Sequence, residues 1–168
     1  MKNLFIFLVI FNLSTSLRAQ KSTFVYLVRH AEKVTNDPTN KDPLLTEQGY
    51  QRALGLAKKF KNQKLSAIYC TDYQRTKLTA EPTAEQKNLI IQIYDPKYLN
   101  AFAEKILEEY KSKKLLIIGH SNTVLETIEA LGGKRPIISI SDNEYDYFFR
   151  VEISKEGLVT VKYERYGE

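Results

Sequence analysis

Cysteine and histidine are both scarce in this chain of 168 residues. The single cysteine, Cys70, excludes an intramolecular disulfide framework and a four-cysteine zinc or iron–sulfur site. Only two histidines, His30 and His120, are available for acid–base, nucleophilic or metal-binding chemistry. Five prolines, seven glycines and a hydrophobic share of 43% also exclude a disordered, collagen-like or low-complexity chain. We therefore expect one ordinary globular domain.

The apolar run at the N-terminus is too short to cross a bilayer. It extends from Leu4 to Leu13, follows Lys2 and precedes small polar residues, which is the layout of a secretory signal. As a helix the run would span about 15 Å, against roughly 30 Å for a bilayer core. We expect residues 1–19 to be a signal peptide cleaved after Ala19, although Leu17 stands where a small residue is preferred and other positions stay open. Residues 20–168 would then form the exported domain, periplasmic or extracellular, without a stable membrane anchor.

Basic residues exceed acidic ones, with a formal net charge of +5 at pH 7. The loss of residues 1–19 removes two basic residues and no acidic one, so the mature domain is only mildly basic. The remaining lysines cluster at residues 58–64 and 111–114, each after a helical pattern, where positive charge complements the helix dipole. A nucleic-acid surface would more typically interleave aromatic and basic residues. We therefore expect no nucleic-acid partner.

Strand and helix patterns alternate along the mature chain. Short β-branched or apolar runs predict strands, and apolar residues at helical spacing predict helices between them. This alternation favours a three-layer α/β/α sandwich with a mainly parallel sheet and an antiparallel C-terminal tail. The predicted strands are residues 23–28, 65–70, 89–94, 115–118, 147–153 and 158–164, the last two around a turn at 155–157. The predicted helices are one after Thr46 that includes residues 53–60, a short one after Asp72, one over 99–110 and one over 123–131.

Capping and turn residues indicate where the later helices begin and end. Thr71 and Asp72 offer cap oxygens to the second helix, which we expect to stop at about residue 80, before Pro82. Thr123 and Glu126 have the spacing of a capping box for the last helix. Two glycines at 132–133 then predict its C-terminal stop.

The two histidines each follow a predicted strand directly. His30 comes after residues 23–28 and Arg29, and His120 comes after residues 115–118 and a glycine. Ligands of a parallel α/β sheet bind outside the carboxyl ends of its strands, so both imidazoles are expected on one rim. Arg75, on the first turn of the helix behind strand 65–70, belongs to the same rim.

This set of side chains suits a phosphoryl group. The guanidiniums of Arg29 and Arg75 present fixed forks of donors to a phosphate dianion, and the helix after His120 adds oriented backbone N–H groups. The same cations oppose protonation of a neighbouring imidazole, which keeps a nitrogen lone pair available as a nucleophile at neutral pH. The positive charges of the two arginines would then both bind the phosphate and keep the histidine nucleophile unprotonated.

Four motifs occur in a fixed order between residues 23 and 133. They are Leu27-Val28-Arg29-His30-Ala31-Glu32, Leu45-Thr46-x-x-Gly49, Cys70-Thr71-Asp72-x-x-Arg75-Thr76-x-x-Thr79-Ala80 and Gly119-His120-Ser121. In these motifs the chain resembles the histidine phosphatase superfamily, in its phosphoglycerate mutase-like branch. Ala31 stands in place of the usual glycine of the Arg-His-Gly-Glu signature.

The resemblance implies a two-step phosphoryl transfer. His30 would attack phosphorus and form a phosphohistidine, which water then hydrolyses. Arg29, Arg75 and His120 would bind the nonbridging oxygens and stabilise the charge of the transition state.

A substrate-binding set comes from the same resemblance, namely Glu32, Asn36 and Ser121. Asn36 is equally explained as a turn former in a loop rich in turn residues. Glu32 is equally explained as a surface partner of Arg29 or Lys33.

The general acid is the main gap in the pattern. Many members of the family protonate the leaving oxygen with a glutamate, and the corresponding stretch here holds Asp95, just beyond a predicted strand. Asp95 is a candidate proton donor and equally a helix cap ahead of Pro96. Without a donor, phosphohistidine, phosphoramidates or acyl phosphates become more plausible substrates than alkyl phosphates.

Other function classes fit the sequence less well. A serine hydrolase built on Ser121 lacks the second glycine of its elbow and a later histidine. A metal site of His30, Glu32 and His120 has plausible ligand types, but a neighbouring arginine disfavours a cation. A phosphate-binding protein without turnover and a phosphomutase stay open as alternatives.

We therefore expect an exported phosphatase that acts on a small phosphorylated substrate or a phosphoprotein, with no cofactor and no metal. Two tyrosines near the tail, Tyr145 and Tyr147, are explained as well by aromatic packing as by ligand stacking.

Overall fold

The computed structural model describes residues 22–167, and the structural statements below concern this part of the chain. The predicted signal peptide, residues 1–19, and its cleavage position lie outside the described residues. No helix within residues 22–167 is both long enough and apolar enough to span a membrane.

Six strands form one sheet in the spatial order β3-β2-β4-β1-β5-β6. The first four in this order pair in parallel, while β5 pairs antiparallel with both β1 and β6. The mainly parallel sheet with an antiparallel C-terminal tail is therefore confirmed. The strands are β1 (Thr23–Arg29), β2 (Ala67–Cys70), β3 (Ile91–Ile93), β4 (Lys114–Gly119), β5 (Tyr147–Ile153) and β6 (Val159–Arg165).

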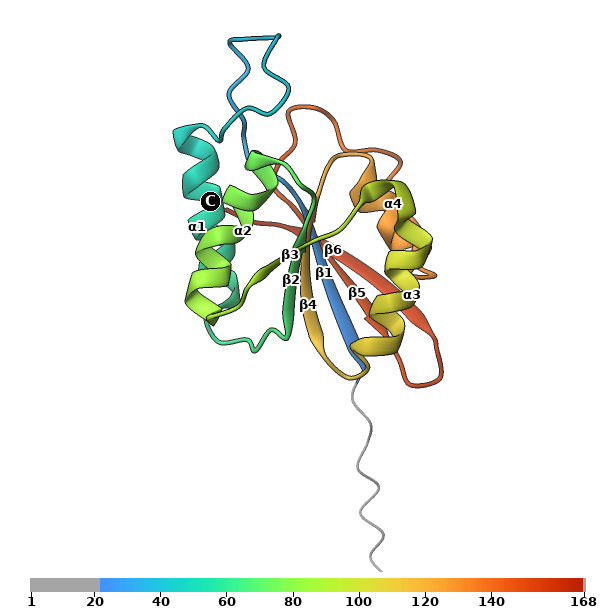
Figure 1. Cartoon of the computed structure of the whole chain (residues 1–168). Helices are drawn as coiled ribbons and strands as arrows, with labels where there is room; N and C mark the ends of the chain where they lie inside the picture. Colours follow the sequence, from blue (N-terminus) through green and yellow to red (C-terminus); the bar gives the residue numbers. More distant parts are fainter. Residues whose placement is uncertain (1–21, 168) are drawn as a thin grey trace, which may run out of the picture.

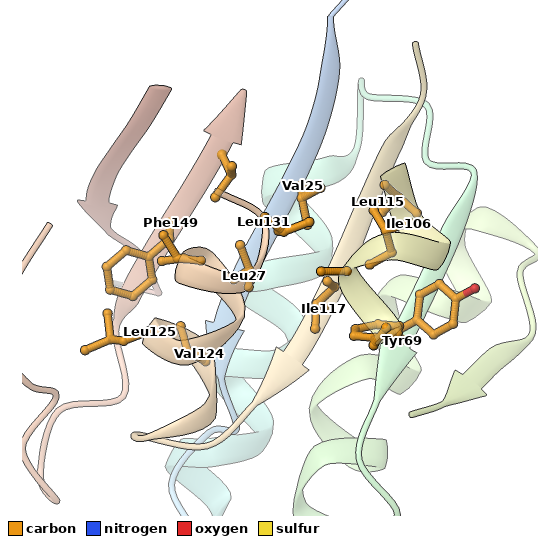
Figure 2. Close-up of a cluster of buried hydrophobic side chains, with 14 of the residues drawn as sticks. Val25, Leu27, Tyr69, Ile106, Leu115, Ile117, Val124, Leu125, Leu131 and Phe149 are labelled. Carbon is orange, nitrogen blue, oxygen red and sulfur yellow. The ribbon is translucent and has the colours of Figure 1, made fainter. Parts of the chain in front are cut away.

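Helices cover both faces of the sheet, as the three-layer prediction requires (Figure 1). Helices α1 (Glu47–Phe60) and α2 (Gln74–Lys87) lie on one face, and α3 (Leu99–Glu109) and α4 (Thr123–Ala130) on the other. Successive residues of β1 point to opposite faces, so Val25 and Leu27 join one apolar cluster and Tyr26 and Val28 the other. Figure 2 shows the first cluster, where side chains of β1 and β4 face those of α3 and α4.

Helix α1 begins where the sequence predicts. The Thr46 hydroxyl accepts a hydrogen bond from the backbone N–H of Gly49 at 3.1 Å, which satisfies one free donor of the first turn. A Cβ on Gly49 would lie 2.2 Å from the carbonyl oxygen of Glu32, so glycine alone allows this close approach. The contact joins the start of α1 to the segment that follows β1.

The predicted end of α2 is wrong, because the helix continues through Pro82 to Lys87. Proline removes one backbone hydrogen bond and crowds the preceding turn, which costs about 3 kcal/mol in a helix interior. Side chains on both sides of the proline are nevertheless buried, including Ala80, Thr83 and Ala84. We infer that packing against α1 and the sheet holds the helix together at this point.

The predicted caps of α2 and α4 do not form. Tyr73 is the N-cap of α2, and Asn122 is the N-cap of α4, each without a side-chain hydrogen bond. The Thr123 hydroxyl instead accepts from the backbone N–H of His120 at 2.9 Å. Gly132, with a φ of +84°, follows α4 in the left-handed conformation and confirms the predicted stop.

Candidate active site

The two histidines meet at the carboxyl ends of β1 and β4. These strands are parallel neighbours in which Arg29 pairs with Gly119, so His30 and His120 follow at the same level. The backbone N–H of His30 donates to the carbonyl of Gly119 at 2.9 Å, and the two ring centroids lie 5.4 Å apart. The expected meeting of the two imidazoles at one rim is thus observed.

The ring of His30 is held in one tautomer by its own loop. Its Nδ1 lies 2.8 Å from the backbone carbonyl of Ala31, and because a carbonyl only accepts, Nδ1 carries the proton. Burial is the main cause that lowers the pKa of His30 to about 3, the hydrogen bond to the Ala31 carbonyl acts in the opposite direction, and the charges of Arg29, His120 and Arg75 contribute smaller decreases. His30 is therefore neutral at pH 7, with the lone pair on Nε2. The expected effect of the cations is present, although burial contributes more.

The ring of His120 is fixed by a threonine that the sequence predicts to be only a cap. The His120 Nε2 lies 2.8 Å from the Thr71 hydroxyl, which leaves Nδ1 as the other polar atom of the ring. Thr71 is fully buried at the end of β2 and also bonds the hydroxyl of Thr76. Burial, followed by the charges of Arg75 and Arg29, lowers the pKa of His120 to about 4. Both imidazoles are therefore neutral at pH 7.

Arg29 is buried at the end of β1 and bound along one edge. Its Nη1 donates to the carbonyls of Ser141, Asp142 and Glu144 at 2.7, 3.1 and 3.1 Å. The guanidinium also lies 4.3 Å from the centroid of the Tyr145 ring. Its Nε is buried and has no hydrogen-bond partner in the described part of the chain. Burial lowers the pKa of this guanidinium, but arginine stays charged in proteins.

Arg75 reaches the same rim from the first turn of α2. Its guanidinium lies 4.2 Å from the centroid of the Tyr73 ring, and its Nη1 lies 3.5 Å from both the Lys41 carbonyl and the Asp42 carboxylate. The Nε of Arg75 is, like that of Arg29, buried without a hydrogen-bond partner among residues 22–167. Two cations with unused donors therefore lie close enough to influence both histidines.

Glu32 has a different partner from either of the two expected. Its carboxylate accepts hydrogen bonds from Nε and Nη2 of Arg52 at 2.6–3.0 Å, in a pair that is mostly buried. Arg52 also donates to the carbonyl of Tyr166 at 2.7 Å. The predicted pairing of Glu32 with Arg29 or Lys33 is therefore wrong, because α1 brings a better-placed guanidinium against the carboxylate.

The other predicted side chains make no hydrogen bond to the histidines or to the two arginines within the described residues. Asn36 is exposed in the loop after β1, and Ser121 is partly buried in the turn before α4. Asp95 is exposed, and its carboxylate accepts from the backbone N–H of Lys97 at 2.9 Å, as the cap of the short 3₁₀ helix η1 (Pro96–Tyr98). Asp95 thus occupies the alternative role that its sequence position allows.

Carboxylates approach the arginines of the site more closely than they approach its histidines. Asp42 lies 3.5 Å from Arg75 and Asp142 lies 3.8 Å from Arg29, while no ion pair joins a carboxylate to either histidine in residues 22–167. In the same range, no three His, Cys, Asp or Glu side chains gather in a way that could hold a metal ion.

Several contributors to the site have no clear motif in the sequence. They are Tyr73, Tyr145 and the carbonyls of residues 141, 142 and 144, whereas Thr71 lies in the third motif but the sequence predicts it only as a helix cap. One signal points to Tyr145. When two neighbouring strands are antiparallel, one begins at the edge of the sheet where the other ends. Because β5 pairs antiparallel with β1, the residues just before β5 lie near the end of β1. Figure 1 shows the loop after β1 and the segment before β5 at the same end of the sheet.

Comparison with known sequences identifies two relationships. The model of the family described as "Histidine phosphatase superfamily (branch 1)" matches residues 25–96. Phosphoserine phosphatase 1 of Hydrogenobacter thermophilus is 36% identical over 96 residues, which cover 50% of this chain and 45% of that protein. The match therefore spans less than half the length of this curated relative.

Comparison with solved structures shows a shared fold at low sequence identity. The protein histidine phosphatase SixA, complexed with tungstate, superimposes with a TM-score of 0.66 and 17% identity, over 84% of this chain and 96% of that one. A mycobacterial glucosyl-3-phosphoglycerate phosphatase gives 0.67 and 11%, over 88% and 99%. A phosphoglycerate mutase from Bacillus anthracis gives 0.61 and 14%, over 86% and 93%. Phosphatases and a mutase thus share this arrangement of strands and helices.

Proposed function

The chain belongs to the histidine phosphatase superfamily, and from this premise we propose that it is a phosphatase with His30 as its nucleophile. One observation carries the proposal. His30 is buried and neutral, its Nδ1 is bound by a backbone carbonyl, and a second histidine and two arginines lie around it. This is the state that nucleophilic attack on phosphorus requires.

The two arginines bind the phosphoryl group in this proposal. Arg29 keeps one edge on backbone carbonyls, so its remaining N–H groups are available to nonbridging oxygens. Arg75 supplies a second fork from α2, and the first turn of α4 adds backbone N–H groups. His120, whose ring is held by Thr71, lies beside His30 at the same rim and completes the surroundings of the phosphoryl group.

The reaction then has two displacements at phosphorus. The lone pair on Nε2 of His30 forms a nitrogen–phosphorus bond while the bond from phosphorus to the leaving atom breaks, and that bond's electron pair departs with the leaving group. Water next attacks the phosphohistidine, the electron pair of the nitrogen–phosphorus bond returns to Nε2, and the proton of the water passes to solvent or phosphate. The arginines stabilise the charge that spreads over the equatorial oxygens in both steps.

The surroundings of the site favour leaving groups that depart without a proton from the enzyme. Asp95 caps η1, and no carboxylate is paired with either histidine in the described chain. Phosphoramidates such as phosphohistidine, acyl phosphates and aryl phosphates meet this condition better than alkyl phosphates. The described activity of one structural neighbour, protein histidine phosphatase SixA, supports this order of substrates.

The test is to trap phosphate on the protein and to measure its turnover. Wild type incubated with a labelled phosphoramidate or aryl phosphate is expected to carry acid-labile phosphate on His30 and to release inorganic phosphate. The His30→Ala variant is expected to show neither. Equal rates for the two proteins would contradict the proposed nucleophile. Bound phosphate without turnover by well-folded wild type would favour the alternative, a phosphate-binding protein, which the capping role of Asp95 would then explain.

We also propose that the protein is exported, because residues 1–19 have the layout of a secretory signal. Mass spectrometry of the protein from fractionated cells is expected to find an N-terminus at Gln20 in the exported fraction. A full-length chain that stays in the cytoplasmic fraction would contradict export.

A further inference from the structure

Four aromatic rings form a continuous row across the candidate active site. The Tyr145 ring centroid lies 5.8 Å from that of His30, His30 lies 5.4 Å from His120, and His120 lies 5.1 Å from Tyr73. The two histidines are the inner members of the row, and a tyrosine stands at each end. A phosphoryl group bound at the histidines is therefore flanked by aromatic side chains.

Each tyrosine also contacts the arginine on its own side. Arg29 lies over the Tyr145 ring at 4.3 Å, and Arg75 lies over the Tyr73 ring at 4.2 Å. The two tyrosines come from unrelated parts of the chain, the start of α2 and the segment before β5. Their matching positions arise from the fold and not from a local repeat.

Tyr73 is an unexpected residue for its place in α2. It is the N-cap, where Ser, Thr, Asp or Asn would satisfy a backbone N–H, and its side chain forms no such hydrogen bond. Tyr73 is 38% exposed, so burial does not fully explain the choice of a large aromatic residue here either. A large aromatic ring that stabilises its own helix poorly, and that is open to solvent beside the site, is well placed to contact a ligand.

We propose that Tyr73 and Tyr145 form the leaving-group site of this enzyme and select phosphorylated substrates whose leaving group is a planar aromatic or heteroaromatic ring. The inference rests on the proposed phosphatase function and refines its substrate class. Edge-to-face and offset contacts between aromatic rings are favourable, and such a contact corresponds to about a two- to tenfold preference in binding. An alkyl leaving group of similar size gains no such contact.

The same substrate class follows from a second feature of the site. No carboxylate is paired with either histidine in the described residues, Asp42 and Asp142 lie against the arginines and Asp95 caps η1, so a leaving group that departs without a proton from the enzyme suits this site best. A phenolate delocalises this pair over its ring, and an imidazole that already carries a proton on its distal nitrogen leaves as a neutral molecule. Aromatic leaving groups thus fit both the walls of the site and its lack of a paired acid.

Two substrates whose leaving groups both depart without a proton, and of which only one is aromatic, separate the recognition of the ring from the chemistry of the leaving group. We would measure kcat/KM for 2,4-dinitrophenyl phosphate and for acetyl phosphate, and take the ratio of the two values. Tyr73→Leu and Tyr145→Leu are each expected to lower this ratio about three- to tenfold, while Tyr73→Phe and Tyr145→Phe retain it. Tyr50→Leu is the control, because Tyr50 is 37% exposed on α1 and has no ring contact with the site.

A binding measurement keeps the inference independent of turnover. Calorimetry is expected to find that phenylphosphonate, which is not hydrolysed, binds wild type more tightly than methylphosphonate does, and that both leucine variants lose this preference. A loss of activity on both substrates in equal proportion would overturn the inference, since the tyrosines would then only position their arginines. An unchanged ratio, or equal binding of the two phosphonates by wild type, would also overturn it. If wild type prefers phenylphosphonate but hydrolyses no substrate, the proposed phosphatase function would be contradicted, while the proposed binding site for aromatic rings would still be supported.

Discussion

Glu144 joins Arg165 of the last strand to the segment that binds Arg29. The Nη2 of Arg165 donates to the Glu144 carboxylate at 2.9 Å, and the same carboxylate accepts from the backbone N–H of Ser141 at 3.0 Å. The carbonyl of Ser141 in turn accepts the shortest of the hydrogen bonds from Arg29. Both donors to Glu144 hold its pKa low, at about 2, so this connection is present across the physiological range.

The variant Arg165→Ala tests whether this connection positions Arg29. We expect kcat to fall about three- to tenfold, because the segment at residues 141–146 loses its anchor and Arg29 becomes less well ordered. The thermal midpoint is expected to fall only modestly, since Arg165 loses ion pairs to Glu144 and Asp146, and a surface ion pair contributes at most about 1 kcal/mol. Steady-state kinetics and a melting curve measure the two effects. Arg135→Ala is the matched control, because Arg135 makes a similar exposed pair with Glu129 that has no contact with Arg29. Equal kinetics for the two variants would refute the positioning role.

The hydrogen bond between the Thr71 hydroxyl and Nε2 of His120 predicts a second positioning effect. Thr71→Val keeps the shape of the side chain and removes the hydroxyl that fixes Nε2 of His120. We expect kcat to fall about five- to tenfold with a smaller change in KM, and Thr71→Ser to restore most of it. Thr83→Val is a suitable control, because the Thr83 hydroxyl is buried without a hydrogen-bond partner among the described residues. If both valine variants retain wild-type kcat, the Thr71 hydroxyl does not position the ring.

Arginine geometry, and not charge alone, is expected to matter at residue 29. Arg29→Lys retains one positive charge but cannot both donate to three carbonyls and hold a phosphate oxygen. We expect kcat/KM for an aryl phosphate to fall by about 10²–10³ and the inhibition constant of inorganic phosphate to rise. Arg150→Lys provides the comparison, since Arg150 is half-buried on β5, where it lies 4.0 Å from the Glu152 carboxylate and 5.8 Å from the centroid of the Phe24 ring. Similar losses in both variants would mean that general charge, not the fork at Arg29, is responsible.

The lowered pKa values of the two histidines predict how activity depends on pH. With His30 near 3 and His120 near 4, protonation removes the free nitrogen only in strong acid. We therefore expect the acidic limb of kcat/KM to lie below about pH 5, and not near the ordinary histidine pKa of 6.5. A pH profile with a substrate stable in acid measures this. A limb centred between pH 6 and 7 would contradict neutral, buried imidazoles.

The lowered pKa values of the two histidines also predict that the free energy of unfolding decreases as the pH falls. Both histidines have a lower pKa in the folded chain than the ordinary value of 6.5, so the unfolded chain binds more protons between these values. The free energy of unfolding is then greatest above about pH 6.5 and falls as the pH decreases toward 4. Urea denaturation at pH 7 and pH 5 checks the direction, and a His30→Gln variant should show a smaller decrease. Equal stability of wild type at the two pH values would refute the prediction.

Part of the site could be predicted because its residues are tied to regular elements. His30 and His120 directly follow buried parallel strands, and the register of β1 with β4 brings them to one level. Side chains whose position depends on long-range packing could not be predicted in this way. Arg52 reaches Glu32 only because α1 packs beside the segment after β1, and Tyr145 reaches Arg29 only because β5 pairs with β1.

Rules for helix ends and helix caps also gave wrong predictions where buried contacts contribute more to stability than the local preference of a residue. Pro82 would end an isolated helix, yet α2 continues through it because residues on both sides of the proline are buried. Thr71 and Thr123 are good caps by composition, but their hydroxyls bind the ring and the backbone of His120. Each hydroxyl satisfies a buried polar group of the site, which is a stronger demand than a helix end open to water.

The pattern of apolar residues along the chain was enough to determine the alternating elements, the layered sheet and the rim that carries both histidines, since burial of apolar side chains is read directly from periodicity. Tertiary structure alone decided which groups hold those histidines and arginines in place. Carbonyls at residues 141–144, Thr71 and the two tyrosines come from segments far apart in sequence, and no local pattern records a distance that only the folded sheet creates.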